Sequence, residues 1–236
     1  MSVRRTQLIT ALDTRDPAQA AQWASAVSPH VDAIKLGLEF AYAAGFDAVE
    51  KVAAGRKLFL DLKLHDIPNT VGSAIASLGR RLRPAMLTIH ASGGSAMVAA
   101  ARKACDDSFP EGERPILLAV TVLTSLDDAA LAEMGVRDGA RAQVLRLAEL
   151  ALRNGADGLV CSPHELSALR QEFGDKPVLV TPGIRPAGAA LGDQKRVMTP
   201  ADARQAGADW IVVGRPITGA ADPAAAAASI AADLAA

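Results

Sequence analysis

The residues best suited to acid–base chemistry lie in one short segment, Asp61–Thr70, whose sequence is DLKLHDIPNT. Side chains two positions apart in a strand point to the same face, so Asp61 and Lys63 should lie side by side. Asp66 follows where Pro68 restricts the backbone, which predicts a lysine between two carboxylates. Nearby opposite charges favour the protonated lysine, which could then donate a proton. The alternative is a surface ion-pair cluster beside a helix cap, because such pairs are common and weak.

Eight short β-type segments must position these residues, and Ala-rich helical segments alternate with them. The expected strands are Gln7–Leu12, Ala33–Leu36, Lys57–Leu62, Met86–His90, Ile116–Leu123, Gly158–Cys161, Val178–Thr181 and Trp210–Val213. Several are continuous apolar runs, which is typical of parallel strands covered on both faces. This alternation over 236 residues predicts an α/β fold, a (β/α)8 TIM barrel that forms a single domain over residues 1–236.

Proline residues that follow a capping side chain mark where helices should begin. These pairs are Asp16-Pro17, Ser162-Pro163, Thr199-Pro200 and Asp222-Pro223. The segment between Ser125 and Gly155 is longer than one helix needs, so we expect an additional short helix there.

Polar residues follow several of the expected strands, at the barrel end where enzymes of this fold have their active sites. Asp13 follows the first expected strand, and Lys35 lies at the end of the second. If Lys35 faces inward, it adds a second cation to the charges of Asp61 and Lys63. His90 and Thr124 also lie at strand ends, but either residue could simply satisfy hydrogen bonds of the barrel.

The loops after the seventh and eighth strands have the composition of a phosphate site. Barrels often bind phosphate there, at the N-terminus of a short helix. Gly214 would let the backbone approach an anion, and Arg185 and Arg215 would offer forked, charge-assisted donors. Gln194 could add an amide donor. Turn glycines with solvated arginines are the alternative interpretation.

The overall composition argues against several classes of partner. A net charge of −1 and an aromatic content of 3% give neither a basic field nor stacking platforms for nucleic acid. Cys105 and Cys161 indicate neither a disulfide framework nor a metal site, so a reduced, cytoplasmic setting is expected. No apolar run is long enough to span a membrane, and no cofactor motif is present, so we expect a soluble enzyme that uses neither metal nor organic cofactor.

Taken together, these segments resemble the orotidine 5′-phosphate decarboxylase family. The resemblance covers almost the whole chain, and its most specific parts are DIPNT, DQKRVMTP and GRPIT. Further matching segments are ALD at Asp13, IKLG at Lys35, HASGG at His90, TVLTS at Thr124 and PGIRP at Arg185. The one departure is Leu64, where many bacterial members have an aromatic residue, and it should face away from the charged pair.

The resemblance implies a barrel that decarboxylates orotidine 5′-phosphate to UMP without a cofactor. Lys63 would protonate C6 of the pyrimidine, and Asp61 would face the substrate carboxylate. Lys35 and Asp13 would maintain the charge array and bind a ribose hydroxyl.

The resemblance also implies a homodimer with shared active sites. Asp66, Ile67 and Thr70 would enter the site of the neighbouring subunit, where Asp66 would complete the catalytic charges. The remaining substrate contacts would be Thr124 to the pyrimidine and Arg185, Gln194, Gly214 and Arg215 to the phosphate.

Two other functions fit parts of this pattern. A related Mg²⁺-dependent phosphosugar decarboxylase shares the D-x-K-x-x-D strand, but it should carry an acidic ligand where this chain has Lys35. A non-catalytic nucleotide-binding barrel would keep the phosphate loops but would not need Asp61 and Lys63, and both are present.

Overall fold

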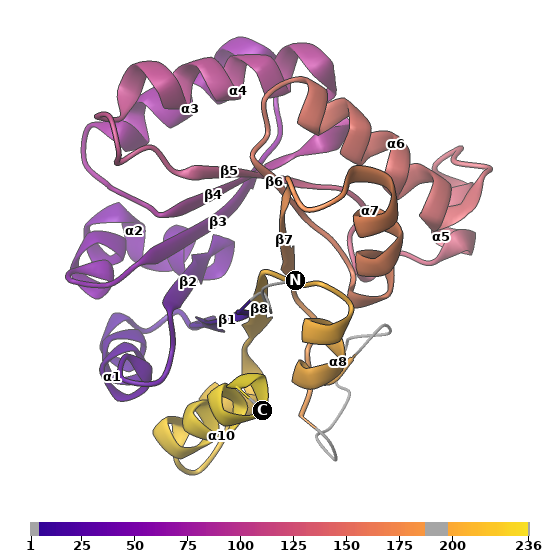
Figure 1. Cartoon of the computed structure of the whole chain (residues 1–236). Helices are drawn as coiled ribbons and strands as arrows, with labels where there is room; N and C mark the ends of the chain where they lie inside the picture. The colour runs from indigo at the N-terminus through magenta and orange to yellow at the C-terminus, as the bar shows by residue number, and fades with distance from the viewer. Residues whose placement is uncertain (1–4, 187–197, 236) are drawn as a thin grey trace.

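The computed structural model describes residues 5–186 and 198–235. Its strands form one closed, parallel barrel in the order β1 to β8, and helices surround the barrel on the outside (Figure 1). The predicted single-domain (β/α)8 fold is therefore confirmed. The strands are β1 Gln7–Ala11, β2 Ala33–Gly37, β3 Leu58–Leu64, β4 Met86–His90, β5 Ile116–Val120, β6 Gly158–Val160, β7 Val178–Thr181 and β8 Trp210–Val213.

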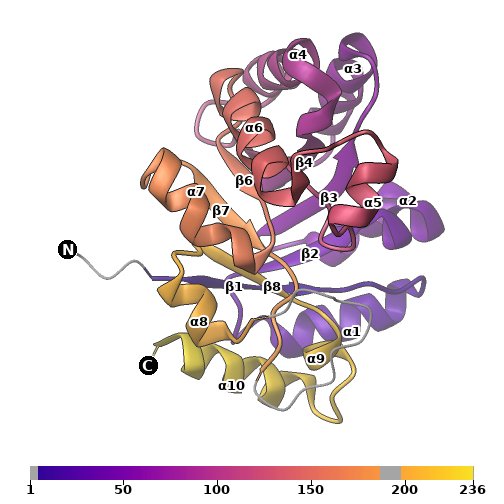
Figure 2. The ribbon, with the colours of Figure 1, turned by 90° about the vertical axis from the view of Figure 1, so that its right-hand side faces the viewer.

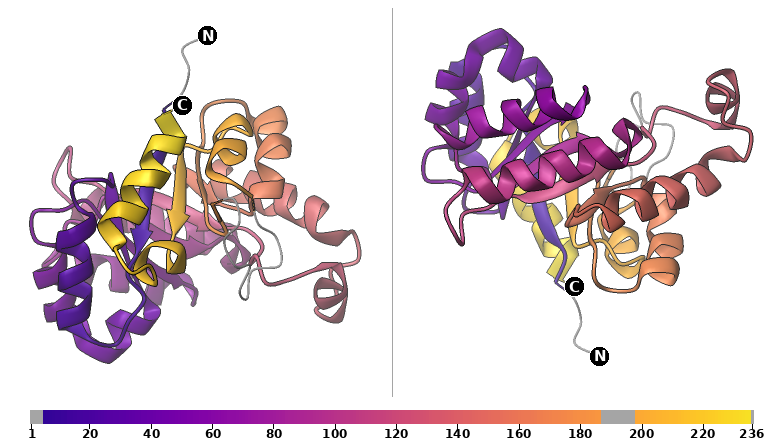
Figure 3. Two further views of the ribbon diagram at one scale, coloured as in Figure 1. Left: turned by 90° about the horizontal axis from the view of Figure 1, so that it is seen from below. Right: turned by 90° about the horizontal axis from the view of Figure 1, so that it is seen from above.

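The helices occupy the segments between the strands. They are α1 Pro17–Val27, α2 Leu38–Ala53, α3 Pro68–Gly79, α4 Gly94–Ser108, α5 Asp128–Glu133, α6 Gly139–Arg153, α7 Leu166–Phe173, α8 Pro200–Gln205, α9 Arg215–Thr218 and α10 Pro223–Ala235, with short 3-10 turns η1 Ala91–Gly93 and η2 Pro163–Glu165. Helix α10 lies between α8 and α1 and closes the ring, while α5 projects at its edge (Figures 1 and 3). None of the helices in the described residues is both long and apolar enough to cross a membrane.

Three of the four predicted helix starts are confirmed by capping bonds, at Asp16, Thr199 and Asp222, whereas Ser162-Pro163 begins the 3-10 turn η2. Asp16 accepts a hydrogen bond from Ala18 N at 2.8 Å, and Asp222 accepts one from Ala225 N at 3.0 Å. Each bond satisfies a backbone donor that the first helical turn leaves free. The expected additional helix is α5, and its N-cap Asp127 accepts from Ala130 N at 3.0 Å.

Two apolar cores hold the barrel together. The inner one fills the barrel and contains residues such as Ile9, Phe59 and Met86, while the outer one packs the strands against the helices. Residues of one strand alternate between these two cores, as the pleat of a β-strand requires. The carboxyl ends of the strands lie together on one side of the barrel, where α5 and α9 are also found (Figure 2).

Two predicted strand ends differ from the structure by more than one residue. β5 ends at Val120 rather than Leu123, and Leu123 is exposed to solvent. β3 instead extends two positions beyond its predicted end, because Leu62 and Leu64 still pack against the outer core. The longer β3 brings both Asp61 and Lys63 inside the strand.

Candidate active site

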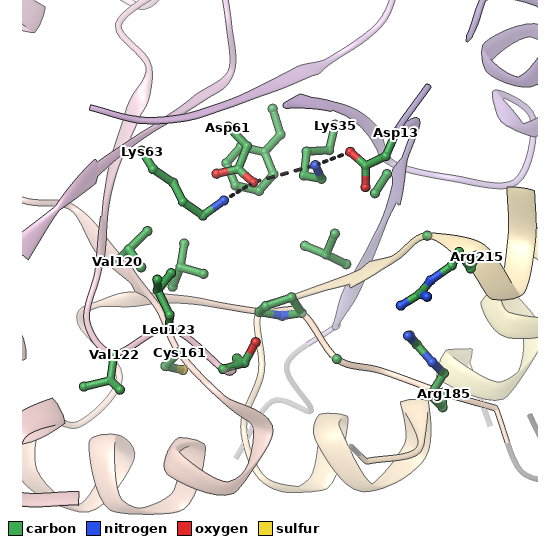
Figure 4. A pocket seen from close by; sticks show the side chains of 18 residues that line it. Asp13, Lys35, Asp61, Lys63, Val120, Val122, Leu123, Cys161, Arg185 and Arg215 are labelled. Carbon is green, nitrogen blue, oxygen red and sulfur yellow. Dashed lines mark hydrogen bonds and ion pairs between the residues drawn. The ribbon is translucent and has the colours of Figure 1, made fainter. Parts of the chain in front are cut away.

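A cavity of about 260 Å³ opens at the carboxyl ends of the strands. Its polar lining includes six charged residues in β2 and β3 or in the segments that follow β1, β7 and β8: Asp13, Lys35, Asp61, Lys63, Arg185 and Arg215. Figure 4 shows the first four on one side of the cavity and the two arginines on another. The cavity thus has a mixed-charge end and a cationic end.

The mixed-charge end is a continuous chain of alternating charges. Lys35 Nζ lies 2.9 Å from Asp13 Oδ1 and 3.7 Å from Asp61 Oδ2. The same Asp61 oxygen lies 2.7 Å from Lys63 Nζ. The expectation that Lys35 faces inward and joins Asp61 and Lys63 is therefore confirmed. Within the described part of the chain, the lysine between two carboxylates is Lys35, whereas Lys63 pairs with Asp61 and not with Asp66.

Burial and charge act in opposite directions on this array. Burial disfavours the Lys35 ammonium, but Asp61 and Asp13 outweigh it, so the pKa of Lys35 lies above its usual range. Burial also disfavours the Asp61 carboxylate, but Lys35 and Lys63 outweigh it and hold the pKa of Asp61 below its usual range. Both groups are therefore charged at neutral pH, although each side chain is only 11% exposed.

Strand β3 presents these groups through an irregular pairing with β4. Leu60 pairs with Leu87 and Leu64 pairs with Ile89, so residues 61–63 lie opposite Thr88 alone. β3 thus has about two residues more than β4 in this stretch. Because an even number of extra residues does not change which face a side chain points to, Asp61 and Lys63 both point inward. Lys63 has a φ of 49°, the only positive value at a non-glycine position in the described residues.

The cationic end is formed after β7 and β8. Gly183 turns the chain with a φ of 80°, and Arg185 N then donates to Met198 O at 3.0 Å. Arg215 follows Gly214 at the start of α9. Burial and the charge of Arg215 lower the pKa of Arg185, which indicates that a bound anion would be stabilised there.

Comparison with known proteins agrees with this arrangement. Residues 6–230 match the model of the "Orotidine 5'-phosphate decarboxylase / HUMPS family". A curated orotidine 5′-phosphate decarboxylase from Gluconobacter oxydans is 61% identical over 233 residues, which cover 98% of each chain. One from Thermobifida fusca is 54% identical over 229 residues, which cover 96% of this chain and 95% of the relative.

This chain belongs to the orotidine 5′-phosphate decarboxylase / HUMPS family. Among solved structures, the orotidine 5′-phosphate decarboxylase from Lactobacillus acidophilus superposes with a TM-score of 0.87 at 42% identity. The superposition covers 98% of this chain and 100% of that one. The fold and the family expected from the sequence are therefore both confirmed.

The residues expected to bind substrate in this family fall into three groups. Thr124 and Gly214 line the same cavity as the charged residues. Asp66, Ile67 and Thr70 are exposed and lie outside its lining, on the loop and first turn that follow β3. Gln194 lies outside the described residues.

Sequence patterns did not mark the apolar wall of the cavity, the contact between His65 and His90, or the role of Thr88. Phe59 and Val212 belong to the wall, and strict strand alternation could have identified them. The rings of His65 and His90 lie 5.3 Å apart at 40°, and burial, His65 and Lys63 lower the pKa of His90. Thr88 is fully buried and bonds to the charged array, but no sequence motif marked it.

Proposed function

We propose that this chain decarboxylates orotidine 5′-phosphate to UMP and CO2, a reaction of pyrimidine biosynthesis. The observation that carries the proposal is the Asp13–Lys35–Asp61–Lys63 array in one cavity with Arg185 and Arg215 (Figure 4). The substrate combines a reacting carboxylate at one end with a phosphate at the other. A mixed-charge end and a cationic end suit those two groups, and the named relatives are orotidine 5′-phosphate decarboxylases.

Lys63 is the proposed proton donor. When the bond between C6 and the carboxylate breaks, CO2 leaves and the electron pair stays on C6. The Lys63 ammonium then gives a proton to C6, which forms the new C–H bond and leaves a neutral amine. A fixed cation beside C6 also stabilises the developing negative charge before the proton moves. Its ion pair with Asp61 at 2.7 Å supports an ammonium that is held ready inside the cavity.

Asp61 is proposed to face the substrate carboxylate. The repulsion between the Asp61 carboxylate and the substrate carboxylate would destabilise the bound substrate. The carbanion would not be destabilised in this way, because the substrate carboxylate has left as CO2. Lys35 and Asp13 complete the array and are proposed to bind a ribose hydroxyl. Lys35 is nearly buried while Asp13 is about half exposed, which suits a carboxylate that meets substrate at the cavity mouth.

The phosphate is proposed to lie between Arg185 and Arg215, with Gly214 offering its backbone. Gln194, which lies outside the described residues, is proposed to add an amide donor. Thr124, which lines the cavity from the loop after β5, is proposed to contact the pyrimidine edge. Phosphate binding far from the reacting bond can hold a site in its closed arrangement and so raise the rate.

A homodimer with shared active sites is part of the same proposal. The residues after β3 are exposed, namely Asp66, Ile67 and Thr70. Ile67 is apolar, yet 66% of its surface is accessible to solvent. Asp66 Oδ1 accepts from Ile67 N at 2.7 Å, so its carboxylate is oriented at the start of α3. A second copy covering this surface would bury Ile67 and bring Asp66 to the partner's cavity.

The proposed mechanism uses side chains and backbone of the protein alone. Lys35 also argues against the Mg²⁺-dependent phosphosugar relative, because its ammonium lies between the two carboxylates that would otherwise attract a cation. We further infer a cytoplasmic location, since Cys105 and Cys161 are both free and buried.

The direct test incubates purified protein with orotidine 5′-phosphate and excess EDTA and measures UMP by chromatography. Rapid formation of UMP supports the proposal and its independence of divalent metal. Turnover that appears only after Mg²⁺ is added would favour the metal-dependent relative. Folded protein that is silent under both conditions would refute the proposed reaction and favour a binding function.

A further inference from the structure

Thr88 lies beneath the charged array and contacts two of its members. Thr88 is on β4, and its side chain is completely buried. It lies between Leu87 and Ile89, which face the outer core, so its own side chain points to the opposite face of the strand. Its hydroxyl oxygen donates to Asp61 Oδ1 at 2.9 Å and accepts from Lys63 N at 2.9 Å. The single hydroxyl proton is used by Asp61, which leaves a lone pair for the Lys63 N–H.

The bond to Lys63 N replaces a missing bond of the sheet. Residues 61–63 of β3 have only Thr88 opposite them, so the regular ladder between the two strands is interrupted there. The positive φ of Lys63 is also unfavourable for a residue with a side chain. Such a conformation persists only where its surroundings hold it, and the Thr88 hydroxyl is the group that holds this N–H.

The bond to Asp61 fixes the direction of its carboxylate. Oδ1 accepts from Thr88, while Oδ2 lies 2.7 Å from Lys63 Nζ and 3.7 Å from Lys35 Nζ. The two oxygens therefore have separate partners: one faces the buried hydroxyl and the other faces the ammonium groups. Without the Thr88 donor, the carboxylate would lose the contact that keeps Oδ2 directed toward both lysines.

We propose that Thr88 is a positioning residue for the decarboxylation, whose hydroxyl holds the Lys63 backbone and the Asp61 carboxylate in their reactive arrangement. This inference rests on the proposed function. Thr88 does not line the cavity, so it acts through Asp61 and Lys63 and not by touching substrate. Its effect should therefore appear in the chemical step and leave phosphate binding by Arg185 and Arg215 unchanged.

Four substitutions separate the hydroxyl from the packing of the side chain. Thr88→Val replaces the hydroxyl by a methyl group, while Thr88→Ser and Thr88→Ala both lack the methyl and differ from each other only in the hydroxyl. Thr10→Val is the matched control. Thr10 is a completely buried threonine on β1, and its hydroxyl has no hydrogen-bond partner among the described residues.

The measurements are kcat and KM for orotidine 5′-phosphate and, by calorimetry, the Kd and stoichiometry of UMP binding. Thr88→Val and Thr88→Ala should lower kcat about 10–100-fold, the loss expected for a hydrogen bond to a charged group in the transition state. KM and the Kd of UMP should change little, and a full stoichiometry shows that the protein is folded. Thr88→Ser should recover most of the kcat lost by Thr88→Ala, and Thr10→Val should behave as the wild type.

Several outcomes would overturn the inference. Wild-type kcat in Thr88→Val would do so, and so would equal losses in Thr88→Ser and Thr88→Ala, which would assign the effect to packing. If Thr88→Val does not fold, the Ser and Ala pair decides the question. A wild-type enzyme without turnover would refute the proposed function itself, whereas an active wild type with an unaffected Thr88→Val would refute only the role of Thr88.

Discussion

Oδ2 of Asp61 lies 2.7 Å from Nζ of Lys63, although the two residues are separated by a single residue of β3. The contact joins a carboxylate whose side chain is only 11% exposed to an ammonium group at the edge of the cavity. Burial alone would favour a neutral Asp61, but the two lysines outweigh burial and keep it ionised. The site is therefore organised by charge, and its chemistry and its stability should respond to the same residues.

The stability of the protein should depend on Asp61 in a pH-dependent way. Its pKa in the folded state lies below the ordinary value of 3.8, so ionised Asp61 stabilises the fold at pH values above 3.8. That contribution is lost as the pH falls through the folded pKa. Asp61→Asn should destabilise the protein by about 3 kcal/mol at pH 7, because it removes one partner of a buried ion pair. The difference from wild type should shrink at pH 3.

Urea unfolding at the two pH values measures this difference. Asp47→Asn is the control, since Asp47 pairs with Arg81 at the exposed surface and its loss should matter little at either pH. A penalty for Asp61→Asn that is equal at pH 7 and pH 3 would contradict the charge-based explanation.

The role of Arg215 can be tested by comparing two substrates. Arg215→Ala should lower kcat/KM for orotidine 5′-phosphate about 10–100-fold, because a charged hydrogen-bond donor to the phosphate is lost. It should change kcat/KM for the nucleoside orotidine very little, since that substrate has no phosphate. Arg153→Ala, which removes a surface pair with Glu149, controls for loss of an exposed arginine. Equal losses on both substrates would remove Arg215 from the phosphate site.

Shared active sites predict complementation between two inactive variants. Lys63→Ala lacks the proposed proton donor of its own cavity, and Asp66→Asn lacks the group proposed to enter the partner's cavity. In a mixed dimer, one of the two sites regains both residues, so mixing the purified proteins should restore activity. The measurement is turnover after subunit exchange, with exchange verified by mass spectrometry of differently tagged chains. Exchange without recovered activity would show that Asp66 acts within its own chain or not at all.

Much of the barrel could be predicted from local sequence. Apolar runs such as the one at Ile116–Val120 define buried parallel strands, and Asp16-Pro17 defines a helix start, because both signals depend on near neighbours in the chain. The inward direction of Asp61 and Lys63 also followed from strand alternation. The charged end of the site was therefore predictable once the strands were placed.

The remaining features depend on contacts between distant segments. The positive φ of Lys63 arises from the mismatch between β3 and β4, and neither strand reveals that mismatch alone. Thr88 is one buried threonine among several, and only its distances to Asp61 and Lys63 distinguish it. The position of Asp66 relative to a cavity involves a second chain, so its role remains a prediction.

The proposed proton transfer from Lys63 to C6 is tested most directly by comparing the wild type with Lys63→Ala. The measurement is kcat for UMP formation from orotidine 5′-phosphate, with UMP binding used to show that the variant is folded. Removing an essential proton donor lowers the rate about 10²–10⁴-fold, and Lys63→Ala also removes a positive charge beside C6. The kcat of the variant should therefore be lower than that of the wild type by about 10⁴-fold or more. Turnover by Lys63→Ala within a few-fold of the wild type, from folded protein, would contradict the account.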